Sequence, residues 1–299
     1  MDQLYAMTVF VTVVDEGGFA SAARRLNVSP PVVTRAIADL EEHLQVRLLT
    51  RTTRVVRVTE AGARYALDCR RLLADIKEAD EAAQGMHGAP RGDLTLTAPV
   101  RFGNMHVMPI VADYLRTYPE VNASCWFVDR VMNMVEEGVD VAVRIGDLPD
   151  SSLHAIRVGT VRRVVCASPG YLEAHGIPLH PQDLGRHTVI SATGITASAQ
   201  WRFMVDGQPR SYELQPRIAT NSNESAITAA LSGFGLTRLM SYQVADHLRA
   251  GTLKLLLTGF EHAPLPVHVV YQEGRQASQK VRTFLDVMVE RLRANTALN

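Results

Sequence analysis

The stretch FASAARRLNVSPPVVTRAIADLEEH, residues 19–43, decides the fold of the amino-terminal part of this chain. Its first half places apolar and small residues at helical spacing up to Leu26, which predicts a short helix with one buried stripe. After a break at Asn27, Ser29 can cap a second helix, whose first position Pro30 fits well. That helix continues with an apolar seam at Val33, Ile37, Leu40 and Leu44. Two short helices and a tight turn are typical of a helix-turn-helix, although an ordinary helical hairpin fits the same pattern.

A run of arginines follows this helix pair directly. The sequence QVRLLTRTTRVVRVT, residues 45–59, contains four arginines and no acidic residue: Arg47, Arg51, Arg54 and Arg57. The alternation in residues 56–58 predicts a small β-hairpin, or wing, that can hold guanidinium groups toward phosphates. A charged run alone is usually a solvated face, but directly after a helix-turn-helix it indicates contact with a DNA backbone.

From about residue 10 to residue 62 the sequence resembles the amino-terminal domain of LysR-type transcriptional regulators. Many positions agree in one order, and they are Phe10, Glu16-Gly17-Gly18-Phe19, Ala22-Ala23-Arg24-Arg25-Leu26, Val28-Ser29-Pro30-Pro31-Val32-Val33-Thr34-Arg35, Ile37, Leu40-Glu41-Glu42, Leu44, Leu48-Leu49, Arg51-Thr52-Thr53-Arg54 and Thr59-Glu60-Ala61-Gly62. The remaining chain fits the family more loosely. The resemblance implies α/β class overall: a mainly helical winged helix-turn-helix, a long linker helix, and a two-lobed, periplasmic-binding-protein-like effector domain.

The resemblance also implies base and phosphate contacts from the second helix of the motif, namely from Ser29, Pro30, Pro31, Val32, Thr34, Arg35 and Ala36. Physically, Arg35 can bind a guanine or a phosphate, and Val32 can pack on a thymine methyl. The family often has glutamine at the position of Pro30. Because proline lacks the side-chain amide of glutamine, we expect less hydrogen-bond readout and more readout of DNA shape there. The other expected DNA-binding residues are Ser21, in place of hydroxyls that the family often has at positions 18 and 20, and the wing residues Arg51 and Arg54.

A long helix is predicted from Thr59, which can cap it, to about residue 84. Apolar and small residues recur on it in steps of four and three, at Tyr65, Cys69, Leu72, Ile76, Ala79 and Ala83. Such a seam can pack against its own domain or dimerise. We favour dimerisation, because the other faces carry charged residues. A two-fold dimer predicts an inverted-repeat operator in double-stranded DNA, and the family implies a homodimer or homotetramer.

Composition shifts divide the chain. We expect a DNA-binding domain over residues 1–58, a linker and dimerisation helix over 59–86, a Gly- and Pro-rich hinge over 87–92, and an effector-binding domain over 93–299. In the last of these, alternating strands and helices predict α/β structure with a mainly parallel sheet. One expected helix covers residues 131–137. The expected lobes are residues 93–161 with 268–299 (lobe one) and residues 162–267 (lobe two).

Ligands of open α/β sheets collect at the carboxyl ends of strands. The strand ends here give a set of candidate effector-binding residues, which the resemblance places at the cleft between the lobes: Pro99, Val100, Arg101, Phe102, Asp129, Arg130, Arg144, Ile145, Gly146, Thr193, Asn221, Ser222 and Asn223. Several arginines among them favour an anionic metabolite. Each residue taken singly also fits a purely structural role, because Asn and Ser cap helices and Arg pairs with surface carboxylates.

The remaining features of the composition mainly exclude classes of function. Net charge is zero, so binding of nucleic acid must come from locally clustered charge. The three cysteines are widely separated, and no metal or other cofactor is expected. We find no long apolar span and no basic leader, which predicts a cytoplasmic protein without membrane contact. Catalytic motifs such as GxSxG and HExxH are absent from the sequence, so the enzyme interpretation is weak. A regulator, contacting RNA polymerase if it activates, is favoured over a binding module with a vestigial DNA domain.

Overall fold

The computed structural model describes residues 2–51, 56–83, 89–148, 153–192, 199–272 and 278–298. The chain divides into two compact units, Met1–Gly92 and Asp93–Asn299. No helix within the described residues is long and apolar enough to cross a membrane.

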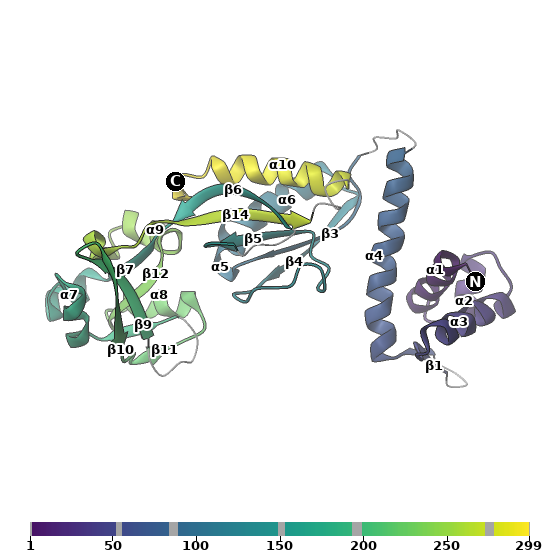
Figure 1. Cartoon of the computed structure of the whole chain (residues 1–299), viewed down its shortest axis with the longest axis horizontal. Coiled ribbons are helices and arrows are strands. Elements are labelled where there is room, and N and C mark those ends of the chain that lie inside the picture. Colours follow the sequence, from purple (N-terminus) through teal and green to yellow (C-terminus); the bar gives the residue numbers. More distant parts are fainter. Residues whose placement is uncertain are drawn as a thin grey trace. The chain divides into compact units, whose positions relative to one another are not determined.

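The first unit consists of three short helices, a small antiparallel hairpin and one long helix (Figure 1). They are α1 (Gln3–Asp15), α2 (Phe19–Arg25), α3 (Pro30–Leu44), β1 (Leu49–Arg51), β2 (Val56–Val58) and α4 (Glu60–Ala83). The predicted helix-turn-helix and wing are therefore both present. The core of this unit is built from side chains that α1, α3 and α4 bury completely, among them Phe10, Val13, Ile37, Leu40 and Cys69.

The turn of the helix-turn-helix is closed by backbone groups. Asn27 adopts a left-handed conformation (φ 54°), a position that asparagine tolerates, and Val28 N–H then donates to Ala23 O at 3.0 Å. The predicted side-chain cap by Ser29 is wrong. The Ser29 hydroxyl would usually accept from the backbone N–H at the second helical position, but that residue is Pro31, which has no N–H. The next N–H, that of residue 32, donates to the Ser29 carbonyl at 3.0 Å instead.

The start of α4 is fastened to the wing. Thr59 caps the helix as predicted, since its hydroxyl accepts from Gly62 N–H at 2.9 Å, and the same hydroxyl donates to Arg47 O at 2.9 Å. A Cβ on Gly62 would lie 2.1 Å from Leu48 O, so only glycine fits this crossing. The wing is tied in turn to α3, because Glu41 Oε1 accepts from the backbone N–H groups of residues 48 and 49 at 2.7 and 2.9 Å.

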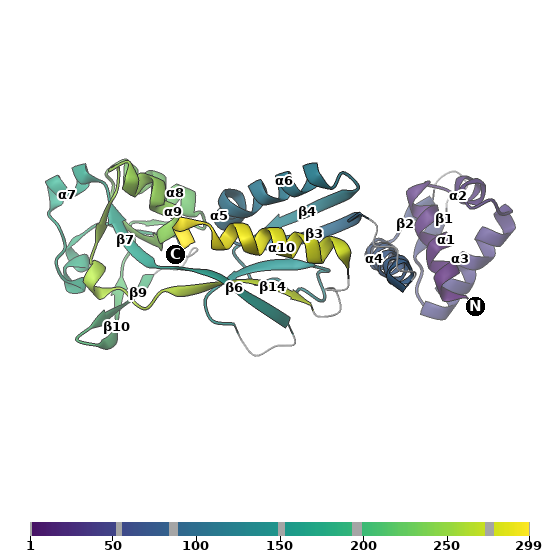
Figure 2. The ribbon, with the colours of Figure 1, turned by 90° about the horizontal axis from the view of Figure 1, so that it is seen from above.

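The second unit contains two five-stranded sheets, one in each lobe (Figures 1 and 2). Lobe one contains β3 (Gly92–Ala98), α5 (Val100–Phe102), the π-helix η1 (Gly103–Val107), α6 (Met108–Thr117), β4 (Val121–Phe127), β5 (Val141–Ile145), β6 (Leu153–Val161), β14 (Leu265–Gln272), α10 (Gln279–Arg293) and η5 (Thr296–Leu298). Lobe two contains β7 (Arg163–Ala167), α7 (Pro169–His175), η2 (Pro181–Arg186), β8 (Val189–Ser191), β9 (Ala199–Val205), β10 (Gln208–Leu214), β11 (Ile218–Ala219), α8 (Asn223–Leu231), β12 (Leu236–Met240), α9 (Ser241–Arg249), β13 (Lys254–Leu256) and η3 (Thr258–Phe260).

The strand orders are β4-β3-β5-β14-β6 in lobe one and β11-β8-β12-β7-β13 in lobe two. Both sheets are mixed, so the prediction of a mainly parallel sheet is wrong. In lobe one, β3 runs parallel to β5, but β14 is antiparallel to both β5 and β6. In lobe two, β8 runs parallel to β11 and β12, while β7 is antiparallel to β12 and β13. The antiparallel pairs arise because the chain crosses between the lobes after β6 and returns along β14.

Helices α6 and α10 pack together over one face of the lobe-one sheet. Tyr114 and Phe284 meet there edge to face, with ring centroids 5.1 Å apart, and the Tyr114 hydroxyl donates to Lys280 O at 2.9 Å. The core of lobe one also includes Tyr242, which comes from α9 of lobe two and packs edge-on against Phe102 at 5.3 Å. Lobe two therefore contributes a buried side chain to the core of lobe one, while it keeps separate cores of its own.

Candidate functional site

The exposed amino-terminal end of α3 has the shape and chemistry of a DNA-reading surface. We call its exposed residues the recognition face, and they are Ser29, Pro30, Pro31, Val32 and Arg35. Val32 is 42% exposed, and Arg35 forms no ion pair with any residue in the described ranges. Thr34 is half-buried. The predicted DNA contact from Ala36 is wrong, because that side chain is buried in the helix-turn-helix core.

The wing presents further arginines. Strands β1 and β2 pair with Arg51 opposite Val56, and the Arg57 side chain is exposed. Arg47 is 83% exposed and lies 3.5 Å from Glu41. Arg54 and the side chain of Arg51 lie outside the described residues, so their phosphate contacts stay predictions. Ser21 is half-buried, and its hydroxyl accepts from Arg24 at 3.3 Å.

The expected dimerisation seam of α4 divides into two parts. Cys69 is fully buried in the core of its own unit and Tyr65 packs beside it, so these two side chains do not belong to a free seam. Heptad spacing cannot separate the two roles, because a helix that packs on its own domain shows the same period. Further along, Leu72 and Ile76 are 41% and 37% exposed. The side chains of Ala79 and Ala83 lie outside the described residues.

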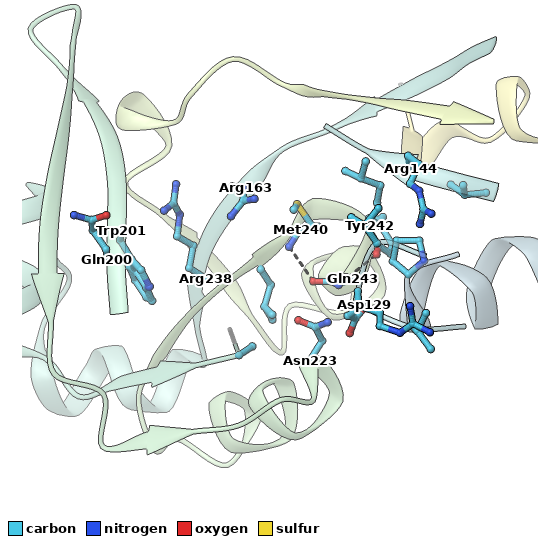
Figure 3. Close-up of a pocket in the computed structure, with 18 residues that line it drawn as sticks. Asp129, Arg144, Arg163, Gln200, Trp201, Asn223, Arg238, Met240, Tyr242 and Gln243 are labelled. Carbon is cyan, nitrogen blue, oxygen red and sulfur yellow. Dashed lines mark hydrogen bonds between the residues drawn. The ribbon is translucent and has the colours of Figure 1, made fainter. Parts of the chain in front are cut away.

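A cavity of about 290 Å³ opens between the two lobes of the second unit (Figure 3). Lobe one lines it from the ends of β3, β4 and β5, and lobe two lines it from β7, β9, β12 and the starts of α8 and α9. The predicted residues that line the cavity are Pro99, Asp129, Arg130, Arg144, Ile145 and Asn223. Their contact with a ligand stays a prediction. Their convergence follows from topology, since strand ends distant in sequence meet at the same cleft.

Other predicted effector-binding residues lie elsewhere. Phe102 is fully buried in the core of lobe one, so the prediction that it contacts a ligand is wrong. Ser222 caps α8, its hydroxyl accepting from Ser225 N–H at 3.2 Å. Val100, Gly146 and Asn221 are not among the residues that line the cavity. Thr193 lies outside the described residues.

Arg101 forms a contact between the lobes that we call the latch. Its guanidinium donates to Gln243 O from Nε at 3.2 Å and from Nη2 at 3.0 Å, and it forms an ion pair with Glu224. Arg101 belongs to α5 of lobe one, whereas Glu224 and Gln243 begin α8 and α9 of lobe two. Burial lowers the pKa of Arg101 from its ordinary value, but the group stays charged. Arg101 therefore joins the lobes and does not line the cavity.

Two arginines of lobe two stand next to each other at the cavity. Met240 of β12 pairs with Arg163 of β7, which makes Arg163 and Arg238 diagonal neighbours on one face of the sheet (Figure 3). Burial and the neighbouring charge of Arg163 lower the pKa of Arg238 to about 10. The Arg238 guanidinium is held by a hydrogen bond to Arg202 O at 2.6 Å and by the Phe203 ring 5.1 Å away, but its buried Nε–H has no partner among the described residues.

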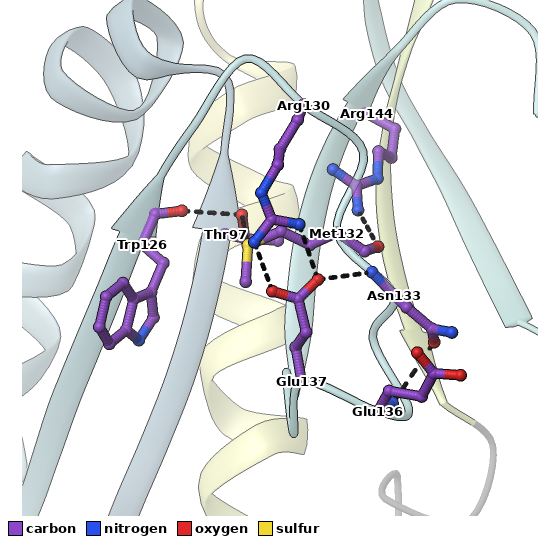
Figure 4. A network of polar contacts seen from close by, with 8 residues as sticks. All are labelled: Thr97, Trp126, Arg130, Met132, Asn133, Glu136, Glu137 and Arg144. Atoms are coloured by element: carbon purple, nitrogen blue, oxygen red, sulfur yellow. Dashed lines mark hydrogen bonds and ion pairs between the residues drawn. The ribbon is translucent and has the colours of Figure 1, made fainter.

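The segment after β4, on the lobe-one side of the cavity, is a loop that polar contacts fix in place (Figure 4). The helix predicted over residues 131–137 is absent, and the segment forms turns. Arg130 clamps Glu137 with two hydrogen bonds of 2.9 and 2.6 Å, and the same carboxylate accepts from Asn133 N–H at 2.9 Å. Arg144 donates to Met132 O at 2.8 Å, which fixes this arginine at the cavity edge. The loop thus neutralises Arg130 and orients Arg144.

Sequence reasoning missed most of the lobe-two wall of the cavity. The missed residues include Arg163, Gln200, Trp201, Arg238, Leu239, Met240, Tyr242 and Gln243. A usable signal existed for the arginines, since Arg163 begins the apolar strand segment RVVCA and Arg238 interrupts the mainly apolar segment LTRLM. No comparable signal marked Gln200 and Trp201, because the β9–β10 hairpin was not predicted. No group of three or more His, Cys, Asp or Glu side chains in the described parts of the chain could hold a metal ion.

Both units match known protein families. Residues 4–63 match the bacterial regulatory helix-turn-helix protein, lysR family, and residues 87–293 match the LysR substrate binding domain. An HTH-type transcriptional regulator of Xanthomonas campestris pv. campestris (strain 8004) is 33% identical, over 95% of this chain and 84% of that protein. CrgA of Neisseria meningitidis serogroup B (strain ATCC BAA-335 / MC58) is 32% identical, with 97% of each covered. The solved structure of CrgA from Neisseria meningitidis has a TM-score of 0.62 at 32% identity, covering 96% of this chain and 98% of that one.

Proposed function

The chain belongs to the LysR family of transcriptional regulators, and we propose that it binds an inverted-repeat operator as a homodimer or homotetramer, under the control of a small anionic effector bound between its lobes. The observation that carries the DNA half of this proposal is the recognition face. It exposes, at the start of α3, an apolar valine and an arginine that has no ion-pair partner among the described residues, and the wing of the same unit carries further arginines. Apolar and bidentate side chains of this kind read base edges in a major groove.

Dimerisation is supported by the exposed part of α4. Leu72 and Ile76 are four residues apart, so they lie on the same face of the helix, and both are more than a third exposed. Burying the exposed two-fifths of these two side chains against a second copy would contribute roughly 1–2.5 kcal/mol. A two-fold arrangement would present two recognition faces to the two halves of a symmetric operator.

An anionic effector is supported by the arginines at the cavity. Arg163 and Arg238 carry like charges on neighbouring strands, and the charge of Arg163 helps to lower the pKa of Arg238, so an anion bound between them would relieve this repulsion. The buried and unpartnered Nε–H of Arg238 provides a donor for such an anion. The effector would regulate DNA binding only through a different affinity for two arrangements of the assembly.

A mobility-shift titration on a genomic fragment recovered by selection tests the DNA half. We expect binding that weakens steeply with salt, because neutralised phosphates release counterions. Arg35→Ala should weaken specific binding by about 1–3 kcal/mol while helix content by circular dichroism stays unchanged. Arg116→Ala, an exposed arginine of the second unit, is the matched control and should bind like the parent. Binding insensitive to salt, or equal loss of binding and helix content, would contradict the proposal.

Sedimentation of Leu72→Glu tests the dimer. We expect the charged side chain to weaken self-association and to reduce operator affinity in parallel, because each half-site then binds alone. Leu67→Glu is the control for charge and exposure, since Leu67 is 67% exposed and lies off the line of Leu72 and Ile76. Self-association that Leu72→Glu leaves unchanged would exclude this face of α4 as the contact.

A further inference from the structure

The cavity between the lobes carries more positive charge than its own carboxylates neutralise. Four arginines line it, and one of them, Arg130, is clamped by Glu137. The other three, Arg144, Arg163 and Arg238, form no ion pair with any residue in the described ranges. Asp129 is the one acid among the lining residues, and its carboxylate accepts from the backbone N–H of Val100 at 3.0 Å. These three arginines against Asp129 leave an excess of two positive charges among the lining residues. The carboxylates that act on Arg144 and Arg238 from outside the lining, Glu137 and Glu261, are already paired with Arg130 and Arg162.

This excess is divided between the two walls. Arg144 belongs to β5 of lobe one and is oriented by its hydrogen bond to Met132 O. Arg163 and Arg238 belong to the β7–β12 pair of lobe two. Figure 3 shows these two arginines on one side of Met240 and Arg144 on the other. Between the two cationic ends Figure 3 labels Met240, Tyr242 and Gln243, and Val143, Ile145 and Leu239 are further apolar residues that line the cavity.

We propose that the effector of this cavity is a compact dicarboxylate, with one carboxylate bound by Arg163 and Arg238, the other by Arg144, and a short hydrocarbon spacer between them. This inference rests on the proposed function and narrows its anionic effector to one class. Two adjacent guanidinium groups suit a carboxylate, which accepts charge-assisted hydrogen bonds at both of its oxygens. The apolar residues in the cavity lining suit methylene groups. The size of the cavity, about 290 Å³, is at the lower end of the range for small-molecule sites.

A dicarboxylate bound in this way bridges the lobes. Its two carboxylates pair with arginines that approach from opposite walls, so the ligand favours whichever lobe arrangement brings those arginines within reach of both ends. A monocarboxylate of the same length satisfies only one end and leaves the other arginine wall unpaired. The preference for two charges over one is therefore the property that distinguishes this proposal from a general affinity for anions.

The test uses full-length protein carrying Trp126→Phe, which leaves Trp201 in the cavity wall as the sole tryptophan. Its fluorescence is titrated with succinate, glutarate and adipate, and with butyrate, valerate and hexanoate, at constant ionic strength. We expect at least one dicarboxylate to bind about tenfold or more tightly than its chain-matched monocarboxylate, since one further charge-assisted hydrogen-bonded contact is worth roughly that ratio. The thermal unfolding midpoint, measured with each ligand, provides a second readout.

Two substitutions locate the two ends, beside a conservative variant and a control outside the cavity. Arg144→Gln should reduce dicarboxylate affinity to that of the monocarboxylate while changing the latter less than about threefold, because a lone carboxylate stays with the arginine pair. Arg163→Gln should weaken both classes. Arg186→Gln, an exposed arginine of lobe two outside the cavity, should alter neither. Circular dichroism of each variant verifies folding, and Arg144→Lys should retain part of the dicarboxylate preference.

Equal affinity for both classes, or an equal loss of both in Arg144→Gln, overturns the dicarboxylate inference while the anionic effector of the proposed function stands. No binding by any of the six acids overturns the inference as well. The DNA half of the proposed function is tested separately by the mobility-shift titration, and its outcome does not depend on the binding of the six acids.

Discussion

The latch between the lobes gives the sharpest test of how this effector domain is held together. Arg101→Met keeps most of the apolar stem and removes the guanidinium that bonds Gln243 O at 3.0 and 3.2 Å. A hydrogen bond from a charged donor is worth about 1.5–3 kcal/mol. The ion pair with Glu224 adds less than about 1 kcal/mol, because the Glu224 side chain is 64% exposed and solvent screens it. We expect Arg101→Met to destabilise the second unit by about 2–4 kcal/mol.

The measurement is the unfolding transition of the second unit by calorimetry, together with amide exchange at the start of α9. Glu224→Gln is the matched control, because it removes only the exposed ion pair and should cost no more than about 1 kcal/mol. Arg101→Lys keeps the charge but not the forked geometry, so its loss should lie between the two. The reasoning is refuted if Glu224→Gln costs as much as Arg101→Met, or if exchange at Ser241–Gln243 is unchanged in Arg101→Met.

Two further outcomes follow from single contacts. Gly62→Ala should destabilise the first unit by about 1–3 kcal/mol and weaken DNA binding, because its Cβ would overlap Leu48 O and separate the wing from α4; Gly170→Ala, with open space around its Cβ, should be neutral in thermal unfolding. Burial lowers the pKa of His106 below its ordinary value, against an opposing effect of Asp246, so folding stability should fall below about pH 6.5 by up to roughly 1.4 kcal/mol per pH unit. His106→Phe should flatten that acid slope in urea unfolding between pH 5 and 7.5, and an unchanged slope would exclude His106 as its source.

The acid dependence of His106 has a structural reason. Its Nδ1 accepts from Asn295 Nδ2 at 3.0 Å, which places the proton on Nε2, a buried atom without a partner among the described residues. A second proton would have to occupy Nδ1 and break that bond. The ring also packs edge-on against Phe102 at 4.9 Å, where a charge is poorly solvated. The neutral ring is therefore the form that the folded state accommodates.

The first unit could be predicted well because its signals are local. The helix-turn-helix, the wing and the cap at Thr59 each depend on residues close in sequence, and their periodicity and turn chemistry are enough to place them. Errors arose where one pattern serves two purposes. Ala36 has the spacing of a surface position but packs inward. Cys69 continues the heptad spacing of α4, but its side chain is buried in the core of the first unit and is not available to a second copy.

The cavity could be predicted only in part, because its two walls obey different rules. Strand ends such as Asp129 and Arg144 were identified because the polar or charged residue stands at the end of an apolar strand. Arg163 begins β7 and Arg238 lies within β12, and their proximity depends on the antiparallel pairing of these two strands, which a parallel sheet would not give. The helix expected over residues 131–137 failed for a similar reason: the Arg130–Glu137 clamp closes that segment as a loop, and helical periodicity cannot reveal it.

The start of α9 joins the features that matter for regulation. Tyr242 completes the core of lobe one, Gln243 O accepts the latch bonds from Arg101, and both residues also line the cavity. The Gln243 side chain accepts from Met240 N–H at 2.9 Å, so it also fixes the turn between β12 and α9. A ligand that contacts these residues therefore acts on the same few groups that hold the lobes together. Because a ligand shifts an equilibrium only by its differential affinity, the latch and the cavity should be energetically coupled, and Arg101→Met should alter effector affinity without touching the effector.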